Sequence, residues 1–174
     1  MSQSLRLAFV LALVALLTSC ATRTRHSPVA GASKSRRMSK VRTTAYTHTE
    51  RGGRRNAIGQ QLCGSKVQSA AADWSRFPLG TKFRIVDTNE VFQIDDYGTA
   101  LVGTDTIDLY KTNRLAMRKW GVRMVDIDIL EWGSEVQSLQ VLAPRSRNRC
   151  CKRMILALQE KTRAQATQQV LRTF

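Results

Sequence analysis

Residue types that build metal sites are scarce in this chain. It has two histidines, His26 and His48, and four cysteines, and neither histidine lies in a cluster with cysteines. Protein zinc sites need several such ligands at short spacings, so we expect no metal and no other cofactor. The sequence also contains no internal repeat and no alternation of strand-like and helix-like segments. These absences argue against repeat proteins and against folds built from βαβ units.

Long hydrophobic runs are also rare. The run Leu7–Leu17 follows Arg6 and is shorter than the about 20 residues that span a membrane as a helix. It leads into Leu17-Thr18-Ser19-Cys20, which resembles a bacterial lipobox. We therefore predict a lipoprotein signal peptide at residues 1–19, cleavage before Cys20, and lipidation of that cysteine. An ordinary signal peptide and an uncleaved anchor are the alternatives.

Lipid chains on Cys20 would hold the protein on the outer side of the cytoplasmic membrane. Position 22 is threonine and not aspartate, so nothing here argues for retention in an inner membrane. We expect a membrane-anchored lipoprotein of the cell envelope that faces the periplasm, on the outer membrane. Disulfides form in such a compartment, and a bond from Cys63 to Cys150 or Cys151 would tie the tail to the core.

Acidic residues are few, 13 against 28 Lys and Arg, and the imbalance lies in the flanks. Residues 21–42 hold seven basic residues and no acid, and residues 144–174 hold eight and one, whereas residues 43–143 hold twelve of each sign. A neutral core on a secreted chain argues against nucleic acid as a partner. We interpret residues 20–41 as a disordered basic linker, either a spacer or a segment attracted to anionic lipids or wall polymers.

Residues 132–174 are interpreted as a C-terminal basic helical extension. Cys151–Phe174 follows Pro144 and contains good helix formers, no glycine or proline, and only a partial apolar stripe. Such a helix packs on the domain, stays solvated, or lies on a membrane surface.

The remaining chain, residues 42–131, is long enough for one small core. Its alternating patterns predict strands at Val41–Thr47, Gly64–Ala71, Lys82–Asp87, Glu90–Asp95, Thr106–Tyr110 and Val122–Leu130. Thr88-Asn89 closes a hairpin, and Gly121 ends a helix over Lys111–Trp120. The last strand does not keep its apolar residues on one face, which suggests a bulge. The pattern indicates a mainly β fold, a small β-barrel with one short helix.

The segment Ile94–Tyr110 contains four carboxylates: Asp95, Asp96, Asp105 and Asp108. They alternate with glycines and small residues, and the segment ends in the strand-like Ile107-Asp108-Leu109-Tyr110. Apolar neighbours raise the pKa of an acid in a strand, and a general acid needs a raised pKa near neutral pH. The alternative is a Gly/Asp turn between two strands, with acids chosen for turn formation.

Five segments, in order, resemble the three-aspartate domain, a double-psi β-barrel family of bacterial cell-wall proteins, and the related rare lipoprotein A-like lipoproteins. The segments are Arg42–Thr47, Ala71–Asp73 with Phe77–Lys82, Asp96–Gly103, Ile107–Tyr110 and Trp120–Leu130. The resemblance covers residues 42–131 and implies a six-stranded double-psi β-barrel.

The family includes lytic transglycosylases, which cut peptidoglycan glycan strands without water. By resemblance the catalytic aspartates are Asp108 as the acid, Asp96 beside it, and Asp73 completing the cleft. Thr44 and Tyr46 resemble the site-lining pair of other double-psi barrels that act on polysaccharide, with ordinary strand positions as the alternative.

One carboxylic acid is enough for this reaction. It protonates the oxygen between N-acetylmuramate and N-acetylglucosamine. As a base it then takes the proton of the muramic C6 hydroxyl, which closes to a 1,6-anhydro product. No second carboxylate is needed to activate water, in contrast to ordinary glycosidases. A nearby carboxylate can raise the pKa of the acid or stabilise positive charge, and Gly98 and Gly103 would let the backbone approach a sugar.

The chain departs from the family pattern near the acids. The family's Asp-Thr-Gly-Gly becomes Asp96-Tyr97-Gly98-Thr99, and the spacing from Gly103 to Asp108 is one residue longer than in many members. Asp105 is therefore a rival in the same loop. Asp95 is a rival for Asp96, although a period of two points the pair to opposite sides.

The tryptophans and the two aspartates of the last predicted strand can be explained without a role in the site. Trp74 either stacks on a sugar or packs in the core, and we expect Trp120 and Trp132 to be packing residues. Asp126 and Asp128 alternate with apolar residues as on a solvated strand face. The sequence leaves an enzyme hypothesis, a lipid-anchored lytic transglycosylase. Its alternatives are a non-catalytic peptidoglycan-binding or expansin-like wall-remodelling lipoprotein and a purely structural envelope lipoprotein.

Overall fold

The structure, a computed structural model, describes residues 36–50 and 52–172. The predicted signal peptide, the lipidation site Cys20 and the linker up to residue 35 lie outside the described residues.

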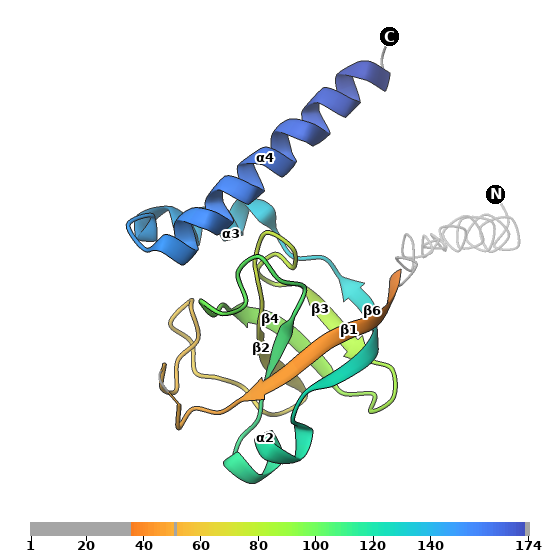
Figure 1. Cartoon of the computed structure of the whole chain (residues 1–174), viewed down its shortest axis with the longest axis vertical. Coiled ribbons are helices and arrows are strands. Elements are labelled where there is room, and N and C mark those ends of the chain that lie inside the picture. The colour runs from red at the N-terminus through yellow and green to blue at the C-terminus, as the bar shows by residue number, and fades with distance from the viewer. Residues whose placement is uncertain (1–35, 51, 173–174) are drawn as a thin grey trace, which may run out of the picture. The chain divides into compact units, whose positions relative to one another are not determined.

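Within residues 36–172, six strands form a closed barrel (Figure 1). The strands are β1 Arg36–Tyr46, β2 Val67–Ala71, β3 Lys82–Ile85, β4 Val91–Asp96, β5 Ile107–Tyr110 and β6 Arg123–Glu131. Around the barrel their order is β1-β5-β2-β4-β3-β6. The prediction of a mainly β fold with a small barrel is confirmed.

Strand pairing brings four small or acidic residues into one row. The pairs β1–β5 and β2–β4 are parallel, and the other pairs are antiparallel. Ala71 on β2 pairs with Asp96 on one side and with Asp108 on the other, and Asp108 in turn pairs with Thr44 on β1. Neighbouring strands lie ~4.8 Å apart, so the Cα atoms of Asp96 and Asp108 are about 10 Å apart.

The barrel is filled by the inward-facing residues of its strands. Seven large apolar side chains on the strands are completely buried: Phe83, Ile85, Phe92, Ile94, Ile107, Leu109 and Ile127. Each such burial contributes roughly 1.5–3 kcal/mol. The core fixes the register of the strands, because a slip by one residue would turn the apolar side chains outward.

Strand β1 begins at Arg36, which corrects the predicted linker: residues 36–41 are not disordered. Arg37 donates two hydrogen bonds to the Asp128 carboxylate, at 2.9 and 3.1 Å. Lys40 adopts a φ of 55° at a bulge in the β1–β6 pairing, and its N–H donates to Asp126 Oδ1 at 2.9 Å. The sequence of this segment is polar and basic. Its order comes from acids of β6 that lie far along the chain.

Other local predictions are confirmed. Strands β3 and β4 form the predicted hairpin, with Asn89 at a φ of 57° in the turn. Helix α2 spans Arg114–Trp120, shorter than predicted because Asn113 caps it, and Gly121 ends it at a φ of 62°. In the β3–β6 pairing two steps along β6 match one step along β3, which is the bulge predicted for the last strand.

Two helices follow the barrel, α3 Glu135–Leu142 and α4 Arg149–Arg172, joined by the 3-10 turn η1 Ala143–Arg145. Helix α3 lies within residues 132–174, which were interpreted as a helical extension, but a separate helix before Pro144 was not predicted. Ser134 caps it by accepting the Gln137 N–H at 3.1 Å. Only the first part of α4 joins the core, through Cys150, Cys151, Met154 and Leu158. Among the described helices, none combines the length and the apolar character that crossing a membrane requires.

The disulfide considered from the sequence, from Cys63 to Cys150 or Cys151, is not formed. Cys63, Cys150 and Cys151 are all free thiols. Cys63 is exposed, where its Sγ lies 3.2 Å from Ser65 Oγ, whereas the other two are buried at the start of α4. Apolar burial, not a covalent bond, therefore holds the tail to the barrel.

Candidate active site

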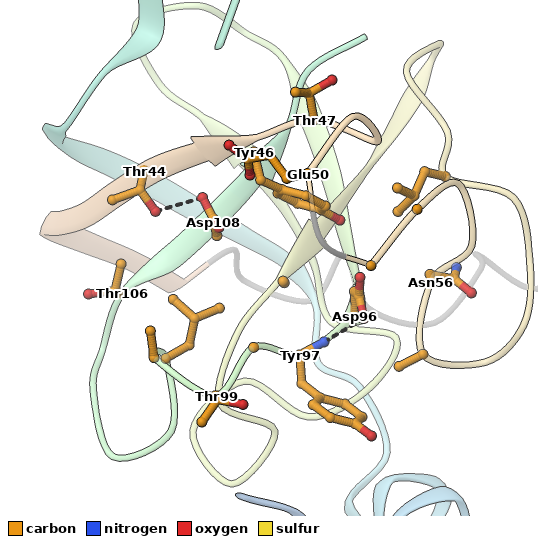
Figure 2. Close-up of a pocket in the computed structure, with 18 of the residues that line it drawn as sticks. Thr44, Tyr46, Thr47, Glu50, Asn56, Asp96, Tyr97, Thr99, Thr106 and Asp108 are labelled. Carbon is orange, nitrogen blue, oxygen red and sulfur yellow. Dashed lines mark hydrogen bonds between the residues drawn. The ribbon is translucent and has the colours of Figure 1, made fainter. Parts of the chain in front are cut away.

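A pocket of about 560 Å³ lies over the row formed by Thr44, Asp108, Ala71 and Asp96, all of which line it (Figure 2). Strands β1, β2, β4 and β5 supply its floor, and the loops that follow β1 and β4 supply its walls. The short Ala71 side chain stands between the two carboxylates, so the floor stays open there. A cavity of this size is typical of small-ligand and saccharide sites.

Asp108 is fixed by its neighbour on β1. The Thr44 hydroxyl donates to Asp108 Oδ1 at 2.6 Å (Figure 2), a contact that follows directly from their pairing in the β1–β5 register. A short hydrogen bond to an ionised oxygen is roughly twice as strong as a neutral one. The Thr-x-Tyr pattern noted in the sequence therefore places its threonine at the site.

Burial raises the pKa of Asp108 above its ordinary value of 3.8. The Thr44 hydrogen bond and the Arg42 charge oppose this shift, and the negative charge of Glu50 adds to it. Arg42 and Glu50 both line the pocket, and Arg42 Nη1 donates to Thr106 Oγ1 at 3.2 Å. Asp108 is thus a carboxyl group whose proton is held more firmly than in water, with charges of both signs within reach.

Asp96 has the larger perturbation. Burial, reinforced by the charge of Asp95, raises the pKa of Asp96 from 3.8 to about 6. The Tyr97 N–H, which donates to Asp96 Oδ1 at 2.9 Å, opposes the shift without cancelling it. Asp96 therefore changes its charge close to neutral pH. Perturbed carboxyl groups in a cleft are typical of active sites.

The Tyr46 side chain lies between the two acids. Its hydroxyl is buried, and burial together with the charges of Asp96, Asp95 and Asp108 raises its pKa. It is close enough to lower the pKa of Asp96, although no hydrogen bond of acceptable geometry joins the two. A buried hydroxyl without a partner is available to a ligand in the pocket.

The two adjacent aspartates face different ways, and a bulge in the β2–β4 pairing places Asp96, and not Asp95, opposite Ala71. Asp95 points away from the pocket and accepts hydrogen bonds from Ser69 Oγ at 2.6 Å and Asn56 Nδ2 at 3.0 Å. Its role is to tie the loop after β1 to the barrel. The rivalry between Asp95 and Asp96 is therefore resolved in favour of Asp96.

Asp73 does not line the pocket, contrary to the expectation that it completes the cleft. It is 2 % exposed, and its carboxylate accepts from Ser75 N at 2.8 Å, Ser75 Oγ at 2.7 Å and Gly103 N at 2.6 Å. It anchors the loop between β4 and β5, which carries the pocket wall. Asp73 acts on the site through that loop.

Gly103 belongs to the same anchor and does not line the pocket, whereas Gly98 does. The φ of Gly103 is +88°, and an added Cβ would lie 2.7 Å from Arg153 Nη2. Asp105, the other rival acid, is exposed and forms an ion pair with Arg76 outside the pocket. The structure thus brings Asp96 and Asp108 together and leaves Asp73 and Asp105 outside.

Trp74 is completely buried and cannot stack on a sugar. Its Nε1–H donates to the Asp96 carbonyl at 2.8 Å, and its ring meets Tyr97 edge-on at 5.1 Å. Trp120 packs in the core as expected, whereas Trp132 is half-exposed and stacks on Phe77.

The start of α4 braces the pocket wall. Cys151 Sγ donates to the Tyr97 hydroxyl at 3.3 Å, Arg145 Nη1 donates to the same oxygen at 3.4 Å, and Trp74 N lies 3.4 Å from Met154 Sδ. Figure 1 shows α4 beginning beside the loops at this end of the barrel. The extension is therefore joined to the site and not only to the barrel.

Sequence reasoning missed several pocket residues. Arg42, Glu50, Arg55 and Asn56 all line the pocket, and three of them lie in or beside the polar loop after β1. Nothing in that loop's composition separates a pocket wall from an ordinary solvated loop. In the described ranges, no group of three or more His, Cys, Asp or Glu side chains is placed to hold a metal ion.

No model of a known protein family matches the chain, and no curated protein matches it. A function for this chain is therefore proposed from the geometry of the pocket and from the segments that resemble the three-aspartate domain.

Proposed function

We propose that this protein is a peptidoglycan lytic transglycosylase in which Asp108 is the general acid and base. The observation that carries the proposal is the row across β1, β5, β2 and β4. It presents two carboxyl groups with raised pKa values, Asp108 and Asp96, to one pocket.

The reaction needs one proton donor that recovers its proton. Protonated Asp108 gives its proton to the glycosidic oxygen as the bond from that oxygen to the muramic C1 breaks. The Asp108 carboxylate then takes the proton of the muramic C6 hydroxyl, whose oxygen bonds to C1. The products are a 1,6-anhydro-muramic end and a free N-acetylglucosamine hydroxyl, and no water is consumed. The raised pKa of Asp108 increases the fraction of molecules that carry this proton at the start of the cycle.

Asp108 is preferred to Asp96 as the acid because the resemblance to the three-aspartate domain gives it that role. Thr44 holds one of its oxygens at 2.6 Å, so the other oxygen is free to meet the substrate. Asp96, with a pKa of about 6, is ionised above that pH and lies on the far side of Ala71. An ionised Asp96 would stabilise the positive charge that develops on the sugar ring.

The arrangement of strands supports assignment to the double-psi barrels, which the three-aspartate family has. Two parallel pairs, β1–β5 and β2–β4, interleave with antiparallel pairs in a closed six-strand barrel. We also propose that Cys20 carries the lipid anchor, which would hold the pocket near the peptidoglycan in the periplasm.

The test is to incubate the protein with purified peptidoglycan and to look by mass spectrometry for 1,6-anhydro muropeptides. Asp108→Asn removes the acid, and Asp87→Asn is the matched control, because Asp87 is exposed in the hairpin turn away from the pocket. We expect anhydro products from the wild type and from the control, and at least a hundredfold less from Asp108→Asn.

Binding of peptidoglycan without any release of products by the wild type would contradict the enzymatic proposal. It would favour the alternative, a wall-binding or expansin-like module in which the acids only hold sugar.

A further inference from the structure

Five basic side chains gather where α4 begins, and all five are exposed. We call this set the basic ridge: Arg145, Arg147, Arg149, Lys152 and Arg153. The ridge occupies nine consecutive residues and contains no acid. It is the described part of the basic C-terminal flank that lies beside the barrel.

The charges of the ridge are not neutralised by the protein. Five ion pairs form among the described residues, and none of them includes a ridge residue. The first turn of α4 has no acidic residue, so Arg149 and Lys152 stand at the positive end of the helix dipole. Cations at that end destabilise a helix by a few tenths of a kcal/mol each. Stability of the fold therefore does not explain why these charges are there.

The ridge adjoins the candidate active site. Arg145 donates to the hydroxyl of Tyr97, and Tyr97 lines the pocket. Arg153 Nη2 lies against Gly103, in the loop that carries the pocket wall. The pocket and the ridge thus share one wall, and a linear ligand leaving the pocket over Tyr97 would reach the ridge.

We infer that the basic ridge is a second binding surface for an anionic polymer, a glycan strand that carries carboxylates, part of which occupies the pocket. The choice of a glycan strand rests on the proposed function. Arginine is suited to carboxylates because its guanidinium group donates two parallel hydrogen bonds. The lactyl group of each muramic sugar offers one carboxylate wherever the peptide is absent, so a strand presents them at regular spacing.

The test removes three ridge charges that make no contact with the pocket wall, in Arg147→Gln/Arg149→Gln/Lys152→Gln. The matched control, Arg118→Gln/Arg163→Gln/Arg172→Gln, removes three exposed charges away from the ridge. Both sets are made in the full chain. All carry Asp108→Asn, so that no strand is cut during the measurement.

The probe is peptide-free glycan strands with free lactyl carboxylates, compared with the same strands after amidation of those carboxylates. We expect the ridge variant to bind the carboxylate strands roughly tenfold more weakly than the control at low salt. The difference should vanish for amidated strands and near 1 M salt, where the Debye length is only about 3 Å.

Equal binding by the ridge variant and the control would overturn the inference. A loss of binding to anionic lipid vesicles, with strand binding unchanged, would overturn it as well and would assign the ridge to a membrane surface. Binding is measured without cutting, so this comparison does not depend on enzymatic activity. A failure of the wild type to release anhydro products would refute the proposed function, and the binding comparison would still test the ridge.

Discussion

Thr44 and Asp108 are cross-strand partners joined by a hydrogen bond of 2.6 Å, on adjacent parallel strands at the floor of the pocket. The pairing of β1 with β5 sets their distance, and the core sets that pairing. The orientation of the proposed acid is therefore a consequence of the strand pairing that closes the barrel.

Removing the threonine hydroxyl should change the pH dependence of strand cleavage. In Thr44→Val the ionised form of Asp108 loses its hydrogen bond, so the pKa of Asp108 rises further. We expect the limb of the pH–rate profile that reports Asp108 to move to higher pH. Thr44→Ser keeps the hydroxyl and should restore the wild-type profile. A profile that does not move would mean that another group provides the proton.

Removing the charge of Glu50 should shift the pKa of Asp108 in the opposite direction. Its negative charge raises the pKa of Asp108, so Glu50→Gln should lower that pKa and move the same limb to lower pH. Because Glu50 is exposed, salt should screen its effect, and the wild type at high salt should approach the variant. Glu131→Gln, on the exposed end of β6, is the control and should leave the profile unchanged. A shift in the same direction as in Thr44→Val would contradict the placement of Glu50.

The ionised Asp96 carboxylate should lower the free energy of unfolding at neutral pH. Its pKa is about 6 in the folded state against 3.8 for an unperturbed aspartate. The folded state therefore binds more protons between these values, and stability falls as pH rises from about 4 through 6. Asp96→Asn removes this penalty and should raise the free energy of unfolding at pH 7 by about 3 kcal/mol.

Urea denaturation at several pH values measures the Asp96 effect. The difference between Asp96→Asn and the wild type should shrink toward zero near pH 4, where the wild-type carboxyl group is protonated. Asp87→Asn should show no such dependence. A variant that is equally or less stable than the wild type at pH 7 would show that Asp96 is not buried as described.

Asp73 should behave as a structural residue. Asp73→Asn replaces an acceptor of the Ser75 or Gly103 hydrogen bonds with a donor, which should cost about 1–3 kcal/mol of stability. The folded fraction should still cleave peptidoglycan, whereas Asp108→Asn should fold normally without cleaving it. Asp105→Asn, which breaks only an exposed ion pair, should cost less than about 1 kcal/mol. An inactive but fully stable Asp73→Asn protein would place Asp73 in the chemistry after all.

Local sequence patterns predicted much of the barrel. The hairpin of β3 and β4, the Gly121 end of α2 and the bulge in β6 are each determined by residues near one another in the chain. The order of β1 at Arg36 and the cap of α3 at Ser134 were missed. The first depends on Asp126 and Asp128, and the second is a short helix whose apolar residues do not form a clear stripe.

The candidate site was predicted unevenly for the same reason. A period of two separates Asp95 from Asp96, but the bulge in the β2–β4 pairing, which places Asp96 opposite Ala71, was not predicted from the sequence. The sequence could not distinguish Asp108 at the pocket floor from Asp73 beneath a loop, because both occur in segments that resemble the same family. The difference lies in which backbone N–H groups Asp73 meets after folding. Glu50 was missed because a loop's polar composition does not tell which side chain turns toward the strands.

The most direct test of the central claim is to digest peptidoglycan in water enriched in heavy oxygen and to determine whether the new ends carry the label. The account predicts anhydro-muramic ends without heavy oxygen, because the C6 hydroxyl of the sugar is the nucleophile. Incorporation of the label into new reducing ends would show that water attacks the sugar, and would contradict the assignment of Asp108 to a lytic, water-independent reaction.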